Sequence, residues 1–135
     1  MSESRIKYYK GLFLVATIYD LVLGIVFLFF NRQVFNMLGV PESLPKFSGF
    51  ILLIGAFLFV IGIAYLMIYL GDLQRNRDLI SIGALYKLAY SSIAFYCLAI
   101  GDYPHLAFIT IFGVTDLIFL VLMTECRVYL GRMEN

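Results

Sequence analysis

Residues 47–70 decide the fold: they read FSGFILLIGAFLFVIGIAYLMIYL and contain no charged side chain. A transmembrane helix needs about 20 consecutive apolar residues to cross a hydrocarbon core of about 30 Å. The apolar residues here are continuous and do not alternate, which favours a helix over a barrel strand. The segment therefore predicts a membrane-spanning helix.

Three further apolar runs of similar length flank this segment, at residues 11–30, 79–100 and 104–127. The connections after the second and third runs are short, so each forces its flanking helices to be antiparallel neighbours. Residues 31–46 are expected to form a short interfacial helix followed by a turn. We predict one all-α domain over residues 1–135, a polytopic membrane protein folded as a four-transmembrane-helix antiparallel bundle.

The composition agrees with this fold class. Hydrophobic residues make up 62% of the chain and charged residues only 14%, whereas a soluble domain is about half apolar and a quarter charged. The net charge of +1 gives no reason to expect a nucleic-acid partner. The composition thus excludes a cytosolic enzyme and leaves an integral membrane protein.

The distribution of Lys and Arg predicts the orientation. The N-terminal segment, the second loop and the C-terminal segment together hold seven of these residues, and the first and third loops hold two. Cytoplasmic segments of membrane proteins carry the excess of Lys and Arg. We therefore expect a multi-pass protein of the cell (inner) membrane with both termini in the cytoplasm.

Three charged residues lie inside the predicted spans instead of in the loops: Asp20, Lys87 and Asp116. The helical rise places each of them about 13–16 Å from the cytoplasmic side, close to one level. Each alone costs about 2.5–3.5 kcal/mol on insertion scales. This cost is hard to explain unless the three groups meet inside the bundle.

Two interpretations of this charged centre remain open. It can be a buried ion triad that fixes the order of the helices and has no chemistry, since buried ion pairs can act as register devices. It can also bind or relay something, because ionisable groups at this depth usually mark a ligand or proton path. A closed, dry centre favours the first interpretation, and a centre open to a cavity favours the second.

The leading functional hypothesis is that the bundle binds a small hydrophobic or amphipathic ligand, such as a lipid or quinone, and acts in transport or as a carrier. The polar head would contact the three charges, and four tyrosines would line the walls. These residues are Tyr19, Tyr65, Tyr86 and Tyr90. The expected partners are the lipid bilayer, such a hydrophobic molecule, and further copies or subunits of a membrane complex.

Two alternatives come from other classes. One is a structural or accessory subunit of a membrane complex, stabilised by the buried triad. The other is a lipid-modifying enzyme of the isomerase type, with the carboxylates as acid and base. No catalytic motif accompanies them, and with a single His we expect neither a metal nor a cofactor.

The chain resembles the small four-helix DoxX-like bacterial membrane proteins. The resemblance lies in the four short spans, in the glycines of the second span at Gly49, Gly55 and Gly62, and in Gly83-Ala84-Leu85-Tyr86-Lys87 of the third. It covers most of the chain and is carried by composition and spacing. It implies an accessory role associated with quinones or redox chemistry, or a chaperone-like role, and it transfers no site residues.

Overall fold

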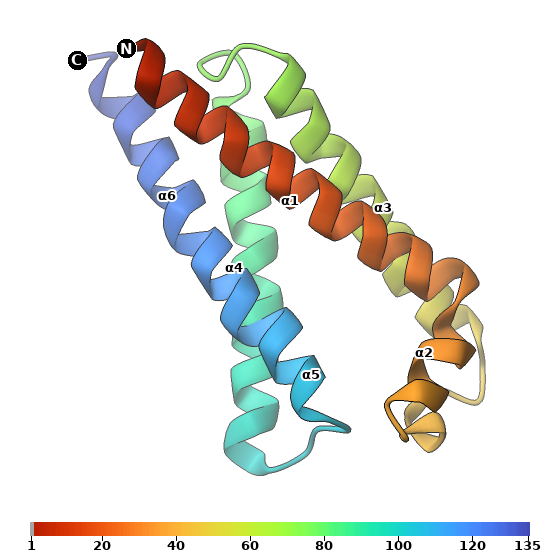
Figure 1. The fold of residues 1–135 in the computed structure, drawn as a ribbon. Helices are drawn as coiled ribbons and strands as arrows, with labels where there is room; N and C mark the ends of the chain where they lie inside the picture. The colour runs from red at the N-terminus through yellow and green to blue at the C-terminus, as the bar shows by residue number, and fades with distance from the viewer. Residues whose placement is uncertain (1) are drawn as a thin grey trace.

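The computed structural model describes residues 2–135, which are helical throughout apart from the connections (Figure 1). Three long helices are α1 (Glu3–Phe29), α3 (Gly49–Leu70) and α4 (Arg77–Ile100). A fourth long helical stretch consists of α5 (Leu106–Phe108), the π-helical η2 (Ile109–Thr115) and α6 (Asp116–Arg132). The first connection contains the short helix α2 (Asn31–Met37) and the 3₁₀ turn η1 (Pro41–Ser43). These residues contain no strand, so the all-α prediction is confirmed.

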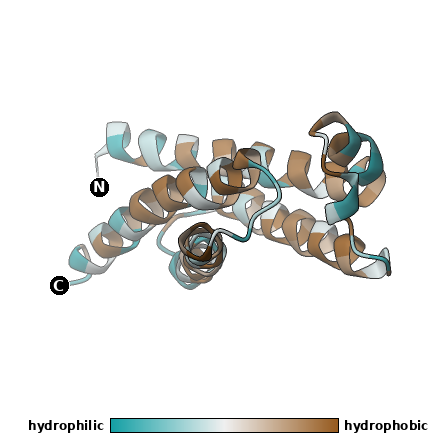
Figure 2. Ribbon diagram, turned by 90° about the horizontal axis from the view of Figure 1, so that it is seen from below, coloured by the Kyte–Doolittle hydropathy of each residue, from teal (hydrophilic) through white to brown (hydrophobic). Residues whose placement is uncertain are grey.

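Four helical stretches are long and apolar enough to cross a membrane, as the sequence predicts. Hydrophobic residues occupy the middle of the long helices, and hydrophilic residues gather at their ends and in the connections (Figure 2). Helix α1 begins at Glu3, ahead of the apolar run that starts near residue 11. The reason is a local cap: the Ser2 hydroxyl accepts a hydrogen bond from the Arg5 backbone N–H at 3.3 Å.

Helices α1 and α3 pack against each other along most of their length (Figure 1). Glycines allow this close approach. A Cβ atom at Gly24 would lie 2.8 Å from the backbone nitrogen of Phe59, and one at Gly62 would lie 3.0 Å from that of Leu21. Small residues at a helix crossing let the two backbones approach closely. Gly24 of α1 and Gly55 and Gly62 of α3 therefore serve the contact between these two helices, whereas Gly49 faces Phe47.

Helix α4 packs against η2 and α6, so the molecule consists of two helix pairs. Both chain termini lie at one end of the molecule, and the two pairs diverge towards the other end, where α2 and α5 lie (Figure 1). The larger cluster of buried apolar residues includes Tyr9, Ile68 and Leu130, and belongs to the half with the termini. The smaller cluster has three buried members, Leu58, Ala94 and Phe112.

Polar contacts also tie the helix pairs together at the end with the termini. The Tyr9 hydroxyl of α1 donates a hydrogen bond to Glu125 Oε1 of α6 at 2.9 Å. The Arg5 guanidinium lies 4.3 Å from the ring centroid of Tyr129, also in α6. Within the second pair, Arg127 Nε donates to the hydroxyl of Ser81 at 2.9 Å. One half of the molecule is thus closed by packing and polar contacts, whereas the helices separate in the other half.

Candidate functional site

The charged centre is assembled from three helices. Asp20 lies in the second half of α1, Lys87 in the middle of α4, and Asp116 at the start of α6. Each side chain is on the buried side of its helix, and the three residues are at most 2% exposed. The expectation that these charges meet inside the protein is confirmed.

Lys87 is the hub of this cluster. Its Nζ donates hydrogen bonds to Asp20 Oδ1 at 3.1 Å, to Asp20 Oδ2 at 3.0 Å and to Asp116 Oδ1 at 3.0 Å. An ammonium group has three N–H donors, so all of them are used. Asp20 receives two of the bonds and Asp116 receives one. The ion triad is therefore closed, with a formal charge of −1 from two carboxylates and one ammonium.

Aromatic rings complete the surroundings of the ammonium. The centroids of Phe119, Tyr19, Tyr65 and Tyr86 lie 4.9, 5.3, 5.7 and 6.0 Å from Lys87 Nζ. A cation within about 6 Å of a ring face is attracted by its quadrupole. Three of the four predicted tyrosines therefore surround the triad. Phe119 was missed, although it lies nearest, because an isolated Phe in an apolar run gives no signal in the sequence.

Two of these tyrosine hydroxyls donate hydrogen bonds to backbone carbonyls. Tyr65 donates to the carbonyl of Gly83 at 3.0 Å, and Tyr19 donates to the carbonyl of Ile111 at 2.9 Å. The buried hydroxyl of Tyr86 has no hydrogen-bond partner among residues 2–135. The hydroxyls of Tyr19 and Tyr65 thus form hydrogen bonds between two different helical stretches and help to hold these stretches together.

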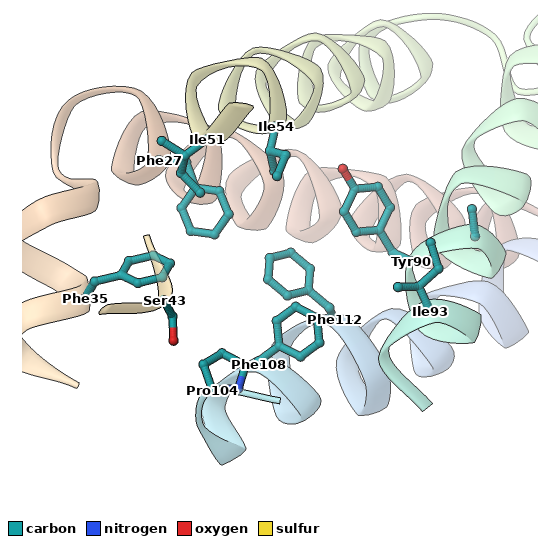
Figure 3. Close-up of a pocket in the computed structure, with 11 residues that line it drawn as sticks. Phe27, Phe35, Ser43, Ile51, Ile54, Tyr90, Ile93, Pro104, Phe108 and Phe112 are labelled. Carbon is teal, nitrogen blue, oxygen red and sulfur yellow. The ribbon is translucent and has the colours of Figure 1, made fainter. Parts of the chain in front are cut away.

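A cavity lies beyond this centre, in the half of the molecule where the helix pairs diverge (Figure 3). Its volume is about 470 Å³, within the range of about 300–1,000 Å³ typical of small-molecule sites. The lining residues come from both helix pairs and are all uncharged: Phe27, Phe35, Ser43, Ile51, Ile54, Ala89, Tyr90, Ile93, Pro104, Phe108 and Phe112. Because Ile54 and Ile93 are exposed, the cavity opens sideways between α3 and α4.

Tyr90 is the single predicted ligand-binding residue among those that line this cavity. Asp20, Lys87 and Asp116 do not line the cavity. The Tyr86 ring, whose centroid lies 6.0 Å from Lys87 Nζ, packs on Tyr90 with centroids 4.5 Å apart. A ligand role for the three charges stays a prediction, and their closed geometry favours the structural interpretation. The cavity residues were missed because its Phe and Ile residues read as ordinary membrane-facing residues.

The π-helix η2 connects the cavity to the triad. Phe112 in η2 lines the cavity, and the same segment ends directly before Asp116. A π-helix shifts hydrogen bonds from i+4 to i+5 and frequently marks a functional site. A side chain adds to these bonds, since the Thr115 hydroxyl donates to the carbonyl of Thr110, five residues earlier, at 3.0 Å. Together with the bond from the Tyr19 hydroxyl to the Ile111 carbonyl, it gives two backbone carbonyls of η2 a side-chain hydrogen-bond donor.

Metal ligands are not clustered in this part of the chain. Within residues 2–135, no group of three or more His, Cys, Asp or Glu side chains could hold a metal ion. The two acidic residues of the triad are occupied by Lys87. The arrangement can therefore hold helices together through charge and enclose an apolar group.

No protein-family model matches the chain, and neither a curated protein nor a solved structure shows significant similarity to it. The resemblance to DoxX-like proteins accordingly stays a prediction. The function has to be inferred from the geometry of the triad and the cavity.

Proposed function

We propose that this protein spans a membrane as four antiparallel helices and binds the apolar part of a lipid-like or quinone-like molecule in its lateral cavity. Four helices of sufficient length and hydropathy support the spanning topology. The excess of Lys and Arg at the termini and in the second loop supports cytoplasmic termini in a cell membrane. The two termini also lie at the same end of the molecule (Figure 1).

The cavity is the observation that carries the binding function. An apolar cavity of about 150 Å³ holds one benzene molecule, so 470 Å³ has room for roughly three groups of that size. That is about the bulk of one long hydrocarbon chain. A chain of this kind is available from the bilayer, and it can enter sideways between α3 and α4 without crossing a polar surface.

The lining also indicates where the polar end of the ligand lies. The cavity wall carries two hydroxyls, those of the half-buried Tyr90 in α4 and of the exposed Ser43 in η1 (Figure 3). Burying a charge without a partner is costly, and all lining residues are uncharged. We expect an uncharged polar group, such as a hydroxyl or carbonyl, beside Ser43, with the hydrocarbon directed towards Tyr90.

In this proposal the triad is a structural support for the cavity and does not contact the ligand. Lys87 joins α1 of the first helix pair to α6 of the second. It does so one turn from the cavity, because Tyr90 follows Lys87 by three residues in α4. The triad thus fixes the distance between the helix pairs at the closed end of the cavity.

The binding function is tested by filling the cavity with a large side chain. Ile93→Trp places an indole inside it, and Ile82→Trp is the matched control because Ile82 is on the same helix, outside the lining, and 55% exposed against 60% for Ile93. The probe is a monoacylglycerol with a diazirine in its chain, crosslinked to purified protein in nanodiscs. We expect crosslinks on the peptides with Ile51 and Ile54, lost in Ile93→Trp and retained in Ile82→Trp.

Equal labelling of every membrane-facing peptide, unchanged by Ile93→Trp, would show only the lipids that surround any membrane protein. That result would refute the binding function. It would favour the second candidate, an accessory subunit of a membrane complex, which the closed geometry of the triad also supports.

A further inference from the structure

A second, smaller cavity adjoins the first. Its volume is about 100 Å³, and it is lined by residues of α1, α2, α5 and η2, among them Leu23, Val26 and Ile111. None of these three lines the first cavity, which faces α3 and α4. The two cavities share five lining residues: Phe27, Phe35, Pro104, Phe108 and Phe112. These shared residues form a partition between two spaces on opposite sides of the molecule.

Aromatic rings make up most of the partition, and Phe112 is at its centre. Its ring centroid lies 5.4 Å from Phe108, 5.6 Å from Tyr90 and 6.0 Å from Phe27. Phe27 continues the row to Phe35 at 6.4 Å. Figure 3 shows the Phe112 ring between the residues of α1 and those of α4. Phe112 therefore packs against three aromatic rings, whereas Phe27 packs against two.

The second cavity is too small to hold a ligand by itself but can extend the first. A space of 100 Å³ is smaller than the cavity of about 150 Å³ that one benzene molecule occupies, so the second cavity holds no ligand of its own. Joined to the first cavity, however, it extends a continuous apolar space across the molecule. Turning one phenyl ring aside would open a passage as wide as that ring. Such a passage admits a flexible single chain but not a rigid system of fused rings.

We propose that Phe112 sets the length of the hydrocarbon chain that the first cavity accepts, and that the ligand class is an amphiphile with one unbranched chain and an uncharged head. This inference rests on the proposed function. A chain that fills the first cavity ends against the Phe112 ring. A longer chain gains no further contact unless the ring gives way to the second cavity.

The test is the dependence of affinity on chain length. Monoacylglycerols of increasing chain length are titrated against the purified protein and its variants. Each additional buried methylene is expected to raise affinity roughly fourfold until the chain reaches the partition, beyond which affinity stays level. Phe112→Ala should move this limit to longer chains, and Phe112→Leu should move it by less.

Phe13→Ala is the control, because Phe13 is also a buried phenylalanine, lies in the apolar cluster at the end with the termini, and lines neither cavity. It should lose stability as Phe112→Ala does and keep the length limit of the unmodified protein. If Phe112→Ala does not give a monodisperse protein, Phe27→Leu tests the same partition and is expected to move the limit in the same direction.

Two failures are distinguishable. An unchanged length limit in Phe112→Ala, or in Phe27→Leu where that variant is needed, overturns the role of the partition but leaves the binding function intact. If the unmodified protein shows no binding, or only binding that Ile93→Trp does not reduce, the proposed function is overturned, and this inference with it.

Discussion

Removal of the Lys87 ammonium is the sharpest test of the charged centre. In Lys87→Met the side chain keeps nearly the same length and volume, so packing changes little while three hydrogen bonds and both ion pairs are lost. Asp20 and Asp116 then remain as two buried carboxylates without a cation. Their mutual repulsion adds to the cost of burying each one.

The expected magnitude follows from the burial of the partners. Lys87 is fully buried, and the two acidic side chains are 1% and 3% exposed, so water cannot replace the lost ammonium without movement of the helices. Breaking a buried ion pair by removing one partner costs about 3–5 kcal/mol. We expect Lys87→Met to lower the free energy of unfolding by at least this amount, since two pairs are broken at once.

Replacing Asp20 and replacing Asp116 should lower the free energy of unfolding by unequal amounts. Asp20 accepts two hydrogen bonds from Lys87 and Asp116 accepts one. Asp116→Asn keeps an oxygen acceptor and leaves a neutral Asp20–Lys87 pair, so we expect a loss below about 1 kcal/mol. Asp20→Asn should cost more. The triple variant Lys87→Met, Asp20→Leu, Asp116→Leu should recover most of the stability, because replacing a whole buried ion cluster by apolar residues is often neutral or favourable.

The assay is equilibrium unfolding of the purified protein in mixed micelles with increasing SDS, followed by loss of helical circular dichroism and by tyrosine fluorescence. Equal stability of Lys87→Met and the unmodified protein would refute the reasoning. So would a triple variant that is less stable than Lys87→Met, since that result would mean that the charges stabilise the fold beyond their mutual neutralisation.

Three further predictions concern packing and topology. Gly24→Ala should destabilise the crossing of α1 and α3 by about 1–3 kcal/mol, because the new methyl group would clash with the α3 backbone. A methyl group at Gly11 meets no atom within 4 Å, so Gly11→Ala should stabilise the helix by about 0.5–1 kcal/mol. Thermal unfolding in detergent measures both effects. Tyr9→Phe should lose about 1 kcal/mol in the same assay, because Glu125 loses a neutral donor. In a background without the native cysteines, a membrane-impermeant maleimide added to intact cells should label Asp102→Cys and not Ser2→Cys; the reverse pattern would contradict the proposed orientation.

Helix existence was predictable because hydropathy over about 20 residues is a property of the local sequence. Residues 47–70 predict a span, and α3 covers Gly49–Leu70. The π-helix η2 was not predictable, because ITIFGVT has no local signal for it. Its carbonyl at Ile111 is taken by Tyr19 of another helix, so the segment depends on a tertiary contact.

The charged centre was predictable for an energetic reason. Burying each of the three charges alone in an apolar helix costs several kcal/mol, and the cost falls when they pair with one another. The cavity was not predictable, because its walls come from seven helical elements and from the connection that contains Pro104. Ile93 of this wall is 60% exposed, and Ile82 on the same helix is 55% exposed. Sequence and exposure alone do not distinguish the residue in the cavity from its membrane-facing neighbour.

The triad and the cavity are linked by the same two helical stretches. Phe112 precedes Asp116 by four residues and Tyr90 follows Lys87 by three, so each stretch places a cavity residue one turn from a charge. The large apolar cluster holds the half with the termini, whereas the other half has three buried apolar residues in its cluster. Apolar packing alone is therefore weakest where the helices separate. Directional polar contacts at the level where the helix pairs begin to separate can keep the two pairs at a fixed spacing. Lys87 supplies these contacts by bonding to Asp20 of one pair and Asp116 of the other.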